Sequence, residues 1–184
     1  MKGTIEFRSP DAGFDRPVEM WLACHERVER FAGLLGRLAA HMKKAGVDDD
    51  ARTTATSIRR YFNEAAPRHH EDEEVDMFPR LRERIDRIAD SRVADVLDRL
   101  EAEHVEMSGL WQSLDATLAE IARGEPAPLD LPLIERFASM YRQHIDAEEQ
   151  VILPALKQLL DRADWDAVGR AMAARRGQRE DTAR

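Results

Sequence analysis

Two short blocks of the chain repeat each other, and each places a histidine four residues before a glutamate. The blocks span His69–Pro79 and His144–Pro154, lie 75 residues apart, and both read H-x-x-x-E-E-x-x-x-apolar-P. Residues four apart on a helix lie one above the other on the same face. Each block therefore directs one imidazole and one carboxylate toward the same place. The two pairs are His69 with Glu73 and His144 with Glu148.

Two more histidines occupy comparable positions in other segments. His25 and His104 lie 79 residues apart, each within a long segment of helical apolar spacing. A single histidine on an apolar face is usually a core residue, but here four helices each carry one. Burying unpaired carboxylates beside them costs several kcal/mol unless a cation offsets their charge. The sequence therefore predicts a metal site built from His25, His69, Glu73, His104, His144 and Glu148.

The types of ligand narrow the choice of metal. Imidazoles and carboxylates without a thiolate suit Fe, Mn or Zn better than Cu(I) or an iron–sulfur cluster. Six ligands exceed the four of a tetrahedral zinc, but they divide evenly over two ions, with two histidines on each and both glutamates bridging. We expect two iron ions, non-haem and carboxylate-bridged, with Zn or Mn as alternatives.

The segments that position these residues have a regular apolar spacing. From Val93 to Ile121, apolar residues and His104 alternate steps of four and three, and the same spacing runs from Trp21 to Met42. Shorter stripes occupy 58–73 and 133–151. Such stripes are typical of bundle helices. The fold class predicted is all-α: an internally duplicated, antiparallel up-down-up-down four-helix bundle with a short C-terminal helix.

Local chemistry predicts the helix boundaries. Pro17 suits the first turn of helix one, with Asp15 as its N-cap. Gly46 ends that helix, and the acidic stretch Asp48–Asp50 begins the next. Pro79 is expected to end or kink helix two, and Pro154 interrupts helix four at the same repeat position. Ser91 and Asp130 are the expected caps of helices three and four.

We therefore divide the chain into three parts. Residues 1–16 form an N-terminal extension, 17–160 the bundle, and 161–184 a short helix near Trp165–Ala174 followed by a frayed tail from Arg175.

The bulk composition excludes several classes of partner. A net charge of −8 and no basic patch argue against nucleic acid. The lone Cys24 cannot form an internal disulfide, no apolar stretch approaches the ~20 residues of a membrane span, and the N-terminus lacks the apolar core of a signal peptide. The expectation is a cytoplasmic protein that contacts neither nucleic acid nor membrane.

At this point the residues resemble the hemerythrin-like HHE cation-binding domains, over about Pro17 to Leu160. The resemblance implies a four-helix bundle around a non-haem di-iron centre. Oxygen-carrying hemerythrins typically have two histidines one turn apart on the third helix, whereas Leu100 and Ser108 flank His104 here. Their last acid is also a more distant Asp. The four-His, two-Glu set is more similar to the repair-of-iron-centres proteins and to bacterial hemerythrin-like proteins. The Cys-containing N-terminal domain of the repair proteins is missing, which argues against a specific repair role.

Several neighbouring residues have alternative interpretations. The pair His70 and Glu74 offers a second register for the helix-two ligands, although the position of Pro79 favours His69 and Glu73. Glu101 either accepts a hydrogen bond from His104 or forms a salt bridge at the rim. Tyr141 either hydrogen-bonds an exogenous ligand or packs in the core. Cys24 is expected to be structural and His41 to lie on the surface.

The function expected is redox or stress-related handling or sensing of O2, NO or peroxide at a di-iron site, or iron donation. One alternative is reversible O2 storage; the other is a metal-stabilised interaction domain without redox chemistry. The sequence contains no nucleophile–base arrangement and no Gly-rich phosphate loop. Any enzymatic activity would thus be carried by the metal. The predicted partner is a small diatomic or peroxide ligand; a homodimer or another protein partner is left open.

Overall fold

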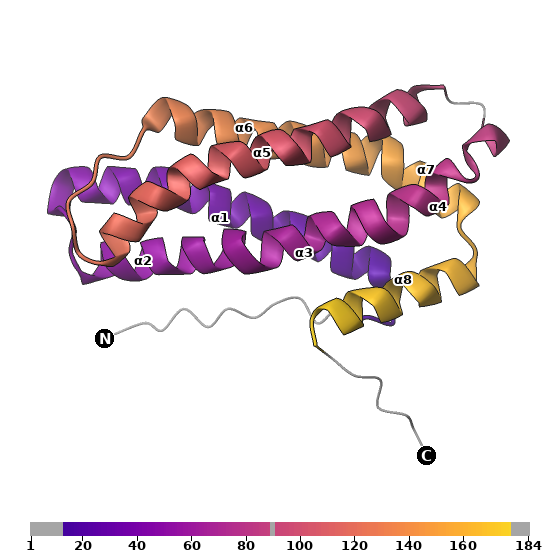
Figure 1. Cartoon of the computed structure of the whole chain (residues 1–184), viewed down its shortest axis with the longest axis horizontal. Helices are drawn as coiled ribbons and strands as arrows, with labels where there is room; N and C mark the ends of the chain where they lie inside the picture. The colour runs from indigo at the N-terminus through magenta and orange to yellow at the C-terminus, as the bar shows by residue number, and fades with distance from the viewer. Residues whose placement is uncertain (1–12, 89–90, 178–184) are drawn as a thin grey trace, which may run out of the picture.

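The computed structural model describes residues 13–88 and 91–177. Four long helical rods lie side by side and alternate in direction, and a shorter helix packs against the side of the bundle near one end (Figure 1). The first rod is α1 (Pro17–Ala45) and the third is α5 (Arg92–Ala122). The second consists of α2 (Asp49–Arg60), η1 (Tyr61–Ala65), α3 (Ala66–Glu71), η2 (Asp72–Met77) and α4 (Phe78–Arg82). The fourth consists of α6 (Leu131–Ala147), η4 (Glu148–Ile152) and α7 (Leu153–Leu159). A 3-10 turn, η3 (Ile85–Arg87), follows α4, and α8 (Arg162–Arg175) comes last.

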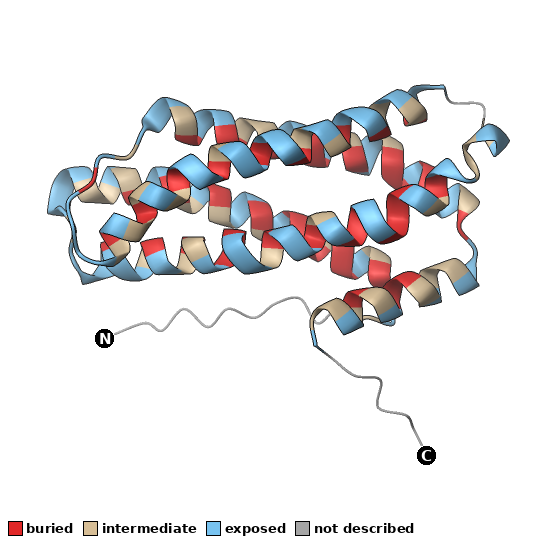
Figure 2. Cartoon of the chain, in the orientation of Figure 1, coloured by how far each residue is buried: buried red, intermediate tan, exposed pale blue. Residues whose placement is uncertain are grey.

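The rods form a closed ring. Helix α1 packs against α2 and α6, and α5 packs against the same two helices from the opposite side. This confirms the prediction of an all-α bundle with a short C-terminal helix. The stripe predicted from Val93 to Ile121 is buried at every position, and buried residues face inward on all four rods (Figure 2).

The capping predictions are confirmed in part. Asp48 accepts a hydrogen bond from the Ala51 amide at 2.9 Å, and Asp130 accepts one from the Leu133 amide at 3.1 Å. Gly46 ends α1 with a φ of 73°, a conformation that glycine adopts without the steric cost of a Cβ. The N-cap of α1 is Arg16 rather than Asp15, with Pro17 as the first helical residue, and Ser91 makes no side-chain capping bond.

Three π-helical segments interrupt the second and fourth rods, and each ends two residues before a proline. Segments η1, η2 and η4 end at Ala65, Met77 and Ile152, and the prolines are Pro67, Pro79 and Pro154. Proline has no amide hydrogen, and its ring clashes with the carbonyl four residues earlier. A locally widened turn relieves that clash while the rod continues. Pro79 and Pro154 therefore widen their helices without ending them.

Two separate apolar cores fill the bundle. One includes Val28 and Met107 and extends toward the loop between α5 and α6; the other includes Trp21 and Leu100 and extends toward α4, α7 and α8. On both α1 and α5, one position of the stripe lies between the two cores. Those positions are His25 and His104. The candidate site is thus a polar layer across the middle of the bundle.

Helix α8 packs on α1 and on η2. Its last residue, Arg175, and the following Arg176 both form ion pairs with the buried carboxylate of Asp72. The two arginines were expected to belong to a frayed tail, and the structure corrects this: an acidic side chain on η2 holds them in place. The rest of the predicted tail beyond residue 177 lies outside the described residues. Within the described ranges, no helix is long and apolar enough to cross a bilayer.

Candidate metal centre

All six side chains proposed as ligands are buried in one place, and every rod contributes. Helices α1 and α5 each give one histidine, His25 and His104. The second and fourth rods each give a histidine from an α-helical turn and a glutamate from the π turn that follows. These residues are His69 and Glu73 from α3 and η2, and His144 and Glu148 from α6 and η4. No one of the six is more than 3% exposed.

The ligand atoms form two groups that share both carboxylates. Within each group all four atoms lie within 4.8 Å of one another. The groups are His25, His69, Glu73 and Glu148, and Glu73, His104, His144 and Glu148. One Glu73 oxygen lies 3.2 Å from His69 Nε2 and the other 3.3 Å from His104 Nε2. Glu148 likewise lies 3.3 Å from His25 Nε2 and 3.4 Å from His144 Nε2.

Three of the four histidines are held from outside by a second carboxylate. Glu149 lies 2.9 Å from Nδ1 of His25, and Glu74 lies 2.6 Å from Nδ1 of His104. Glu103 lies 2.9 Å from Nδ1 of His144. A carboxylate at Nδ1 accepts that nitrogen's hydrogen, which leaves Nε2 free to bind a cation.

The sequence analysis considered this role only for Glu101, as one of two alternatives, and the structure gives it to Glu74, Glu103 and Glu149 instead. The signal was present for Glu74 and Glu149, because both repeated blocks carry a second glutamate directly after the first. Glu103, one residue before His104, contacts a histidine on another helix, and no sequence spacing marks it.

His69 is the exception, since its Nδ1 is buried and finds no hydrogen-bond partner within residues 13–88 and 91–177. The 79-residue offset between His25 and His104 makes Cys24 the counterpart of Glu103. Cys24 is buried and free, and burial raises the pKa of its thiol. The two halves therefore match in their inner six residues and in the glutamates that hold His25 and His104, and they differ where Glu103 is replaced by Cys24.

The electrostatics of the layer are those of a site short of positive charge. Among the protein groups alone, burial and the negative charge of Glu148 raise the pKa of Glu73 to about 7. Burial alone would also raise the pKa of Glu148, but His144 and His25 together hold it well below its ordinary value. Burial lowers the pKa of His69 well below its ordinary value. Two carboxylates this close cannot both ionise cheaply without a cation.

The donor set fits a pair of cations. Four of the buried inner atoms have no hydrogen-bond partner among the residues that the structure describes: His25 Nε2, one oxygen of Glu73 and both oxygens of Glu148. Buried polar atoms are rarely left unpaired, since each costs about 1–3 kcal/mol. The indole of Trp21 donates to the remaining Glu73 oxygen at 2.5 Å. Each group offers four nitrogen and oxygen donors to a cation.

The structure also shows where the neighbouring residues with alternative interpretations lie. His70 belongs to neither group, so the register of His69 and Glu73 is the one that faces the centre. Glu101 pairs with Arg82 at 3.0 Å, which is the rim salt bridge. Tyr141 is buried, and its hydroxyl lies 3.4 Å from His70 Nε2. His41 is at the surface, 2.8 Å from Asp48.

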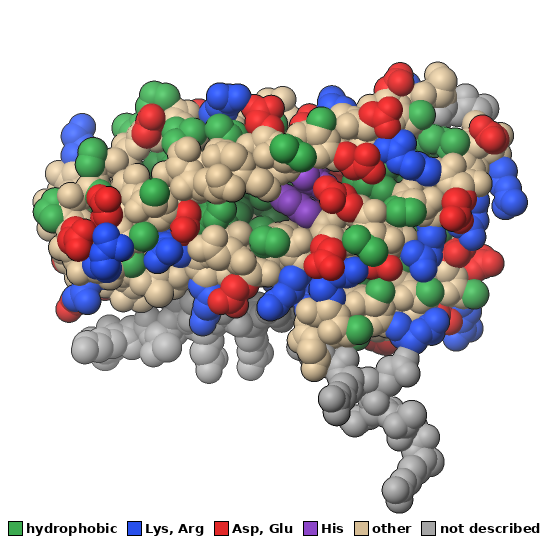
Figure 3. Space-filling model, in the orientation of Figure 1, with side chains coloured by type: hydrophobic (Ala, Val, Ile, Leu, Met, Phe, Trp, Pro, Cys, Tyr) green, Lys and Arg blue, Asp and Glu red, His purple; other side chains and the backbone are tan. Residues whose placement is uncertain are grey.

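A cavity of about 480 Å3 reaches the centre from outside, and His104 is part of its wall. It lies between the second rod and α5. Figure 3 shows histidine side chains visible from outside in the middle of this face, next to a hollow lined by apolar side chains.

Comparison with known proteins agrees with this geometry. A protein of Haemophilus influenzae, itself uncharacterized, is 34% identical to this chain over 169 residues, which cover 92% of this chain and 95% of that protein. Residues 16–156 match the hemerythrin HHE cation-binding domain. With the buried histidine and glutamate layer in the middle of that span, the chain belongs to the hemerythrin HHE cation-binding domain family.

Proposed function

We propose that the six inner residues hold two iron ions and that the protein carries out redox chemistry on O2, NO or a peroxide. One observation carries the proposal: the two groups of four donors share both carboxylates. This sharing is what a bridged pair of ions requires. Each ion would receive two imidazoles and two carboxylate oxygens, which leaves coordination positions for a small ligand.

Iron would supply one-electron chemistry at each ion. The protein's own contribution is positioning and exclusion of water. Glu74, Glu103 and Glu149 fix three imidazoles in the orientation that faces the centre. The apolar cores on both sides of the layer exclude bulk solvent everywhere except along the cavity, which strengthens the electrostatic interactions within the layer.

Elemental analysis of protein purified without added metal tests the proposal. We expect about two irons per chain and, in air, the visible charge-transfer bands of a bridged ferric pair. His69→Ala and Glu148→Ala should each lose at least one ion and lower the melting temperature, because binding and folding are linked. His41→Ala, at the surface, is the control and should keep both ions. About one zinc and no iron per chain would overturn the proposal in favour of a metal-stabilised interaction domain.

Reversible O2 storage is separated from irreversible redox chemistry by adding O2 to the anaerobic ferrous protein. We expect rapid oxidation that vacuum does not reverse. A long-lived oxygenated form that releases O2 under vacuum would instead assign the protein to storage.

A further inference from the structure

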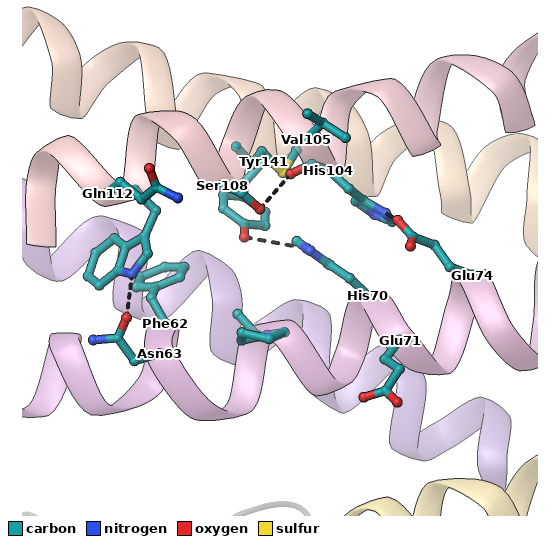
Figure 4. A pocket seen from close by; sticks show the side chains of 14 residues that line it. Phe62, Asn63, His70, Glu71, Glu74, His104, Val105, Ser108, Gln112 and Tyr141 are labelled. Atoms are coloured by element: carbon teal, nitrogen blue, oxygen red, sulfur yellow. Dashed lines mark hydrogen bonds and ion pairs between the residues drawn. The ribbon is translucent and has the colours of Figure 1, made fainter.

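The cavity beside the candidate metal centre is larger than a diatomic ligand needs. Its volume of about 480 Å3 lies within the range of pockets that bind small organic molecules, about 300–1,000 Å3. Figure 4 shows Phe62 at one end of the cavity and His70 and His104 at the other. Trp111, which also lines the cavity, packs against Phe62.

The end near the centre is polar. The ring of His70 stacks on the ring of His104, with centroids 3.9 Å apart and planes 11° from parallel. His70 therefore lies against a candidate ligand without being one. The Tyr141 hydroxyl approaches His70 Nε2 at 3.4 Å, and Figure 4 shows the two side chains pointing toward one another. Burial raises the pKa of Tyr141, so its phenol keeps its proton and remains a hydrogen-bond donor.

The far end is aromatic and fixed in place. The rings of Phe62 and Trp111 lie 4.8 Å apart. The indole nitrogen of Trp111 donates to the Asn63 side-chain oxygen at 2.8 Å, which holds the ring against the cavity. An apolar group bound here would be transferred from water to an aromatic surface. This would contribute roughly 25 cal/mol of binding free energy per Å2 of buried apolar area.

The polar end occurs in only one half of the duplicated sequence. The 75-residue offset makes Ile145 the counterpart of His70, and Ala66 the counterpart of Tyr141. The inner ligands repeat in both halves, whereas this pair does not. Holding the two ions therefore does not require His70 and Tyr141, and their chemistry is available for a bound molecule.

We propose that this cavity binds an organic hydroperoxide, with its apolar group against Phe62 and Trp111 and its oxygen–oxygen bond beside His70 and Tyr141. This rests on the proposed function and narrows its substrate class. A molecule with an apolar body and a small oxygen-bearing head matches both ends of the cavity. His70 and Tyr141 are positioned to hydrogen-bond that head next to the ion site formed with His104.

The reaction balances with the ferrous pair as the reductant. The oxygen–oxygen bond would break, and the two electrons needed would be supplied by the bound pair, one from each Fe(II), which would leave two Fe(III). Two protons complete the products, which are one alcohol and one water for each hydroperoxide consumed.

The test compares two peroxides on the anaerobic ferrous protein, with oxidation followed by stopped-flow absorbance. Cumene hydroperoxide carries an aromatic body and hydrogen peroxide does not. Val105→Trp fills the mouth of the cavity from a position that is 74% exposed, so it leaves the core intact. Leu131→Trp, at a site 59% exposed and outside the cavity lining, is the matched control. We expect Val105→Trp to lower the rate of iron oxidation by cumene hydroperoxide by roughly tenfold or more. The rate with hydrogen peroxide, and both rates in the control variant, should be unchanged.

Two further variants address the polar end. His70→Phe keeps a ring beside His104, and Tyr141→Phe keeps the aromatic body, but each removes a hydrogen-bonding group. Both variants should retain the full metal content, and in both the rate of iron oxidation by cumene hydroperoxide should fall by a factor of about ten. A measurement without turnover accompanies them: 2-phenyl-2-propanol, the unreactive alcohol product, should bind the wild type in calorimetry and bind Val105→Trp more weakly.

The outcomes distinguish this inference from the proposed function. If Val105→Trp leaves both the peroxide rates and the alcohol binding unchanged, the cavity is not the binding site and the inference is wrong. If neither peroxide oxidises the bound iron, the proposed peroxide chemistry fails. In that case the calorimetry with 2-phenyl-2-propanol still tests whether the cavity binds an organic molecule. If the wild type does not bind this alcohol, the inference is wrong.

Discussion

The second glutamate of each repeated block lies just outside the inner layer and contacts a histidine from the other half of the chain. Glu74 binds His104, and Glu149 binds His25. The first glutamate of each block also spans both halves, since Glu148 lies between His25 and His144. The adjacent pair of glutamates therefore has two tasks, one toward the ions and one toward an imidazole.

Removing an outer carboxylate should weaken metal binding without removing a ligand. In Glu149→Ala, His25 loses the group that fixes its orientation, so we expect a 10–100-fold lower metal affinity, about the effect of such outer partners in other proteins. Asp146→Ala removes an exposed negative charge from the same rod and serves as the control. Competition with a chelator measures both affinities. Equal affinities in the two variants would show that the contact to His25 has no such role.

Metal binding should strengthen as the pH rises. Burial alone would lower the pKa of His144, but Glu148 and Glu103 raise it to about 10, and the pKa of Glu73 is raised to about 7. Both groups thus hold protons near neutral pH, and a cation must displace them. We expect the affinity for Zn(II) to increase between about pH 6 and about pH 8, with protons released on binding. Titration of metal-free protein in weakly buffered solution measures this release, and a pH-independent affinity would contradict it.

At the residue scale, the sequence predicted which side chains the structure brings together. The repeated blocks and the two histidines on the α1 and α5 stripes were sufficient, because helical periodicity alone places them on inward faces. The same reasoning did not find Glu103, which reaches His144 across a helix–helix interface. Nor did it predict the stacking of His70 on His104, which depends on the rotation of two rods against each other.

The π turns are the distinguishing feature at the scale of the elements. Glu73 lies in η2 and Glu148 begins η4, and each π segment precedes a proline. In each block the histidine lies in the α-helical turn before the π segment, and the glutamate lies at or next to the start of that segment. The sequence indicated an irregularity at these prolines but predicted an end or a kink. Whether a helix stops or widens depends on the packing of the residues beyond the proline.

Replacing one of these prolines should lower metal affinity without lowering the stability of the metal-free protein. Pro154→Ala restores an amide hydrogen and allows a regular α-helix, so the helical rod should be no less stable. The turn that begins at Glu148 would tighten and shift its carboxylate relative to the ligands on the other rods, so we expect metal affinity to fall by about tenfold or more. Metal titration and urea unfolding of the metal-free protein provide the two measurements. Unchanged affinity would mean that the π turn does not set the position of Glu148.

Helix α8 holds the outer side of η2. The fully buried carboxylate of Asp72 accepts hydrogen bonds from the guanidinium groups of Arg175 and Arg176. Arg175 also donates a hydrogen bond to Asp76 at 2.8 Å. Since Glu73 follows Asp72 directly, this contact fixes the segment that carries a candidate ligand. The sequence did not predict it, because nothing in the spacing of 161–184 shows where α8 docks.

Arg176→Ala should therefore destabilise the metal-free protein by about 1–3 kcal/mol, because a buried carboxylate loses one of its two charged partners. Arg162→Ala on the same helix is the control, since Arg162 is 95% exposed and its removal should change stability by less than about 0.5 kcal/mol. Urea unfolding gives both free energies. A loss in Arg176→Ala no larger than in the control would show that the contact does not stabilise the fold.

For the whole molecule, the polar layer separates two apolar cores. The alternating steps of four and three along the sequence predicted the bundle well, because each stripe must be buried against its neighbours. They did not predict that the stripe would divide into two cores at the histidines. That division comes from the buried charges of the layer, which no apolar side chain can replace without losing a ligand.

Glu73 and Glu148 each lie between a histidine of their own half and a histidine of the other half. A single helical hairpin therefore contains only part of the candidate metal centre. A chain cut between Ile88 and Ser91 gives two fragments, each with two of the four inner histidines and one of the two shared glutamates. We expect the fragments to take up metal when they are produced together and not when produced separately, as elemental analysis of each preparation would show. Metal uptake by one fragment as a monomer would contradict this. An ancestor with a single hairpin would accordingly have had to form a homodimer to complete the centre. After gene fusion, the residues around the two sides of the centre could change independently.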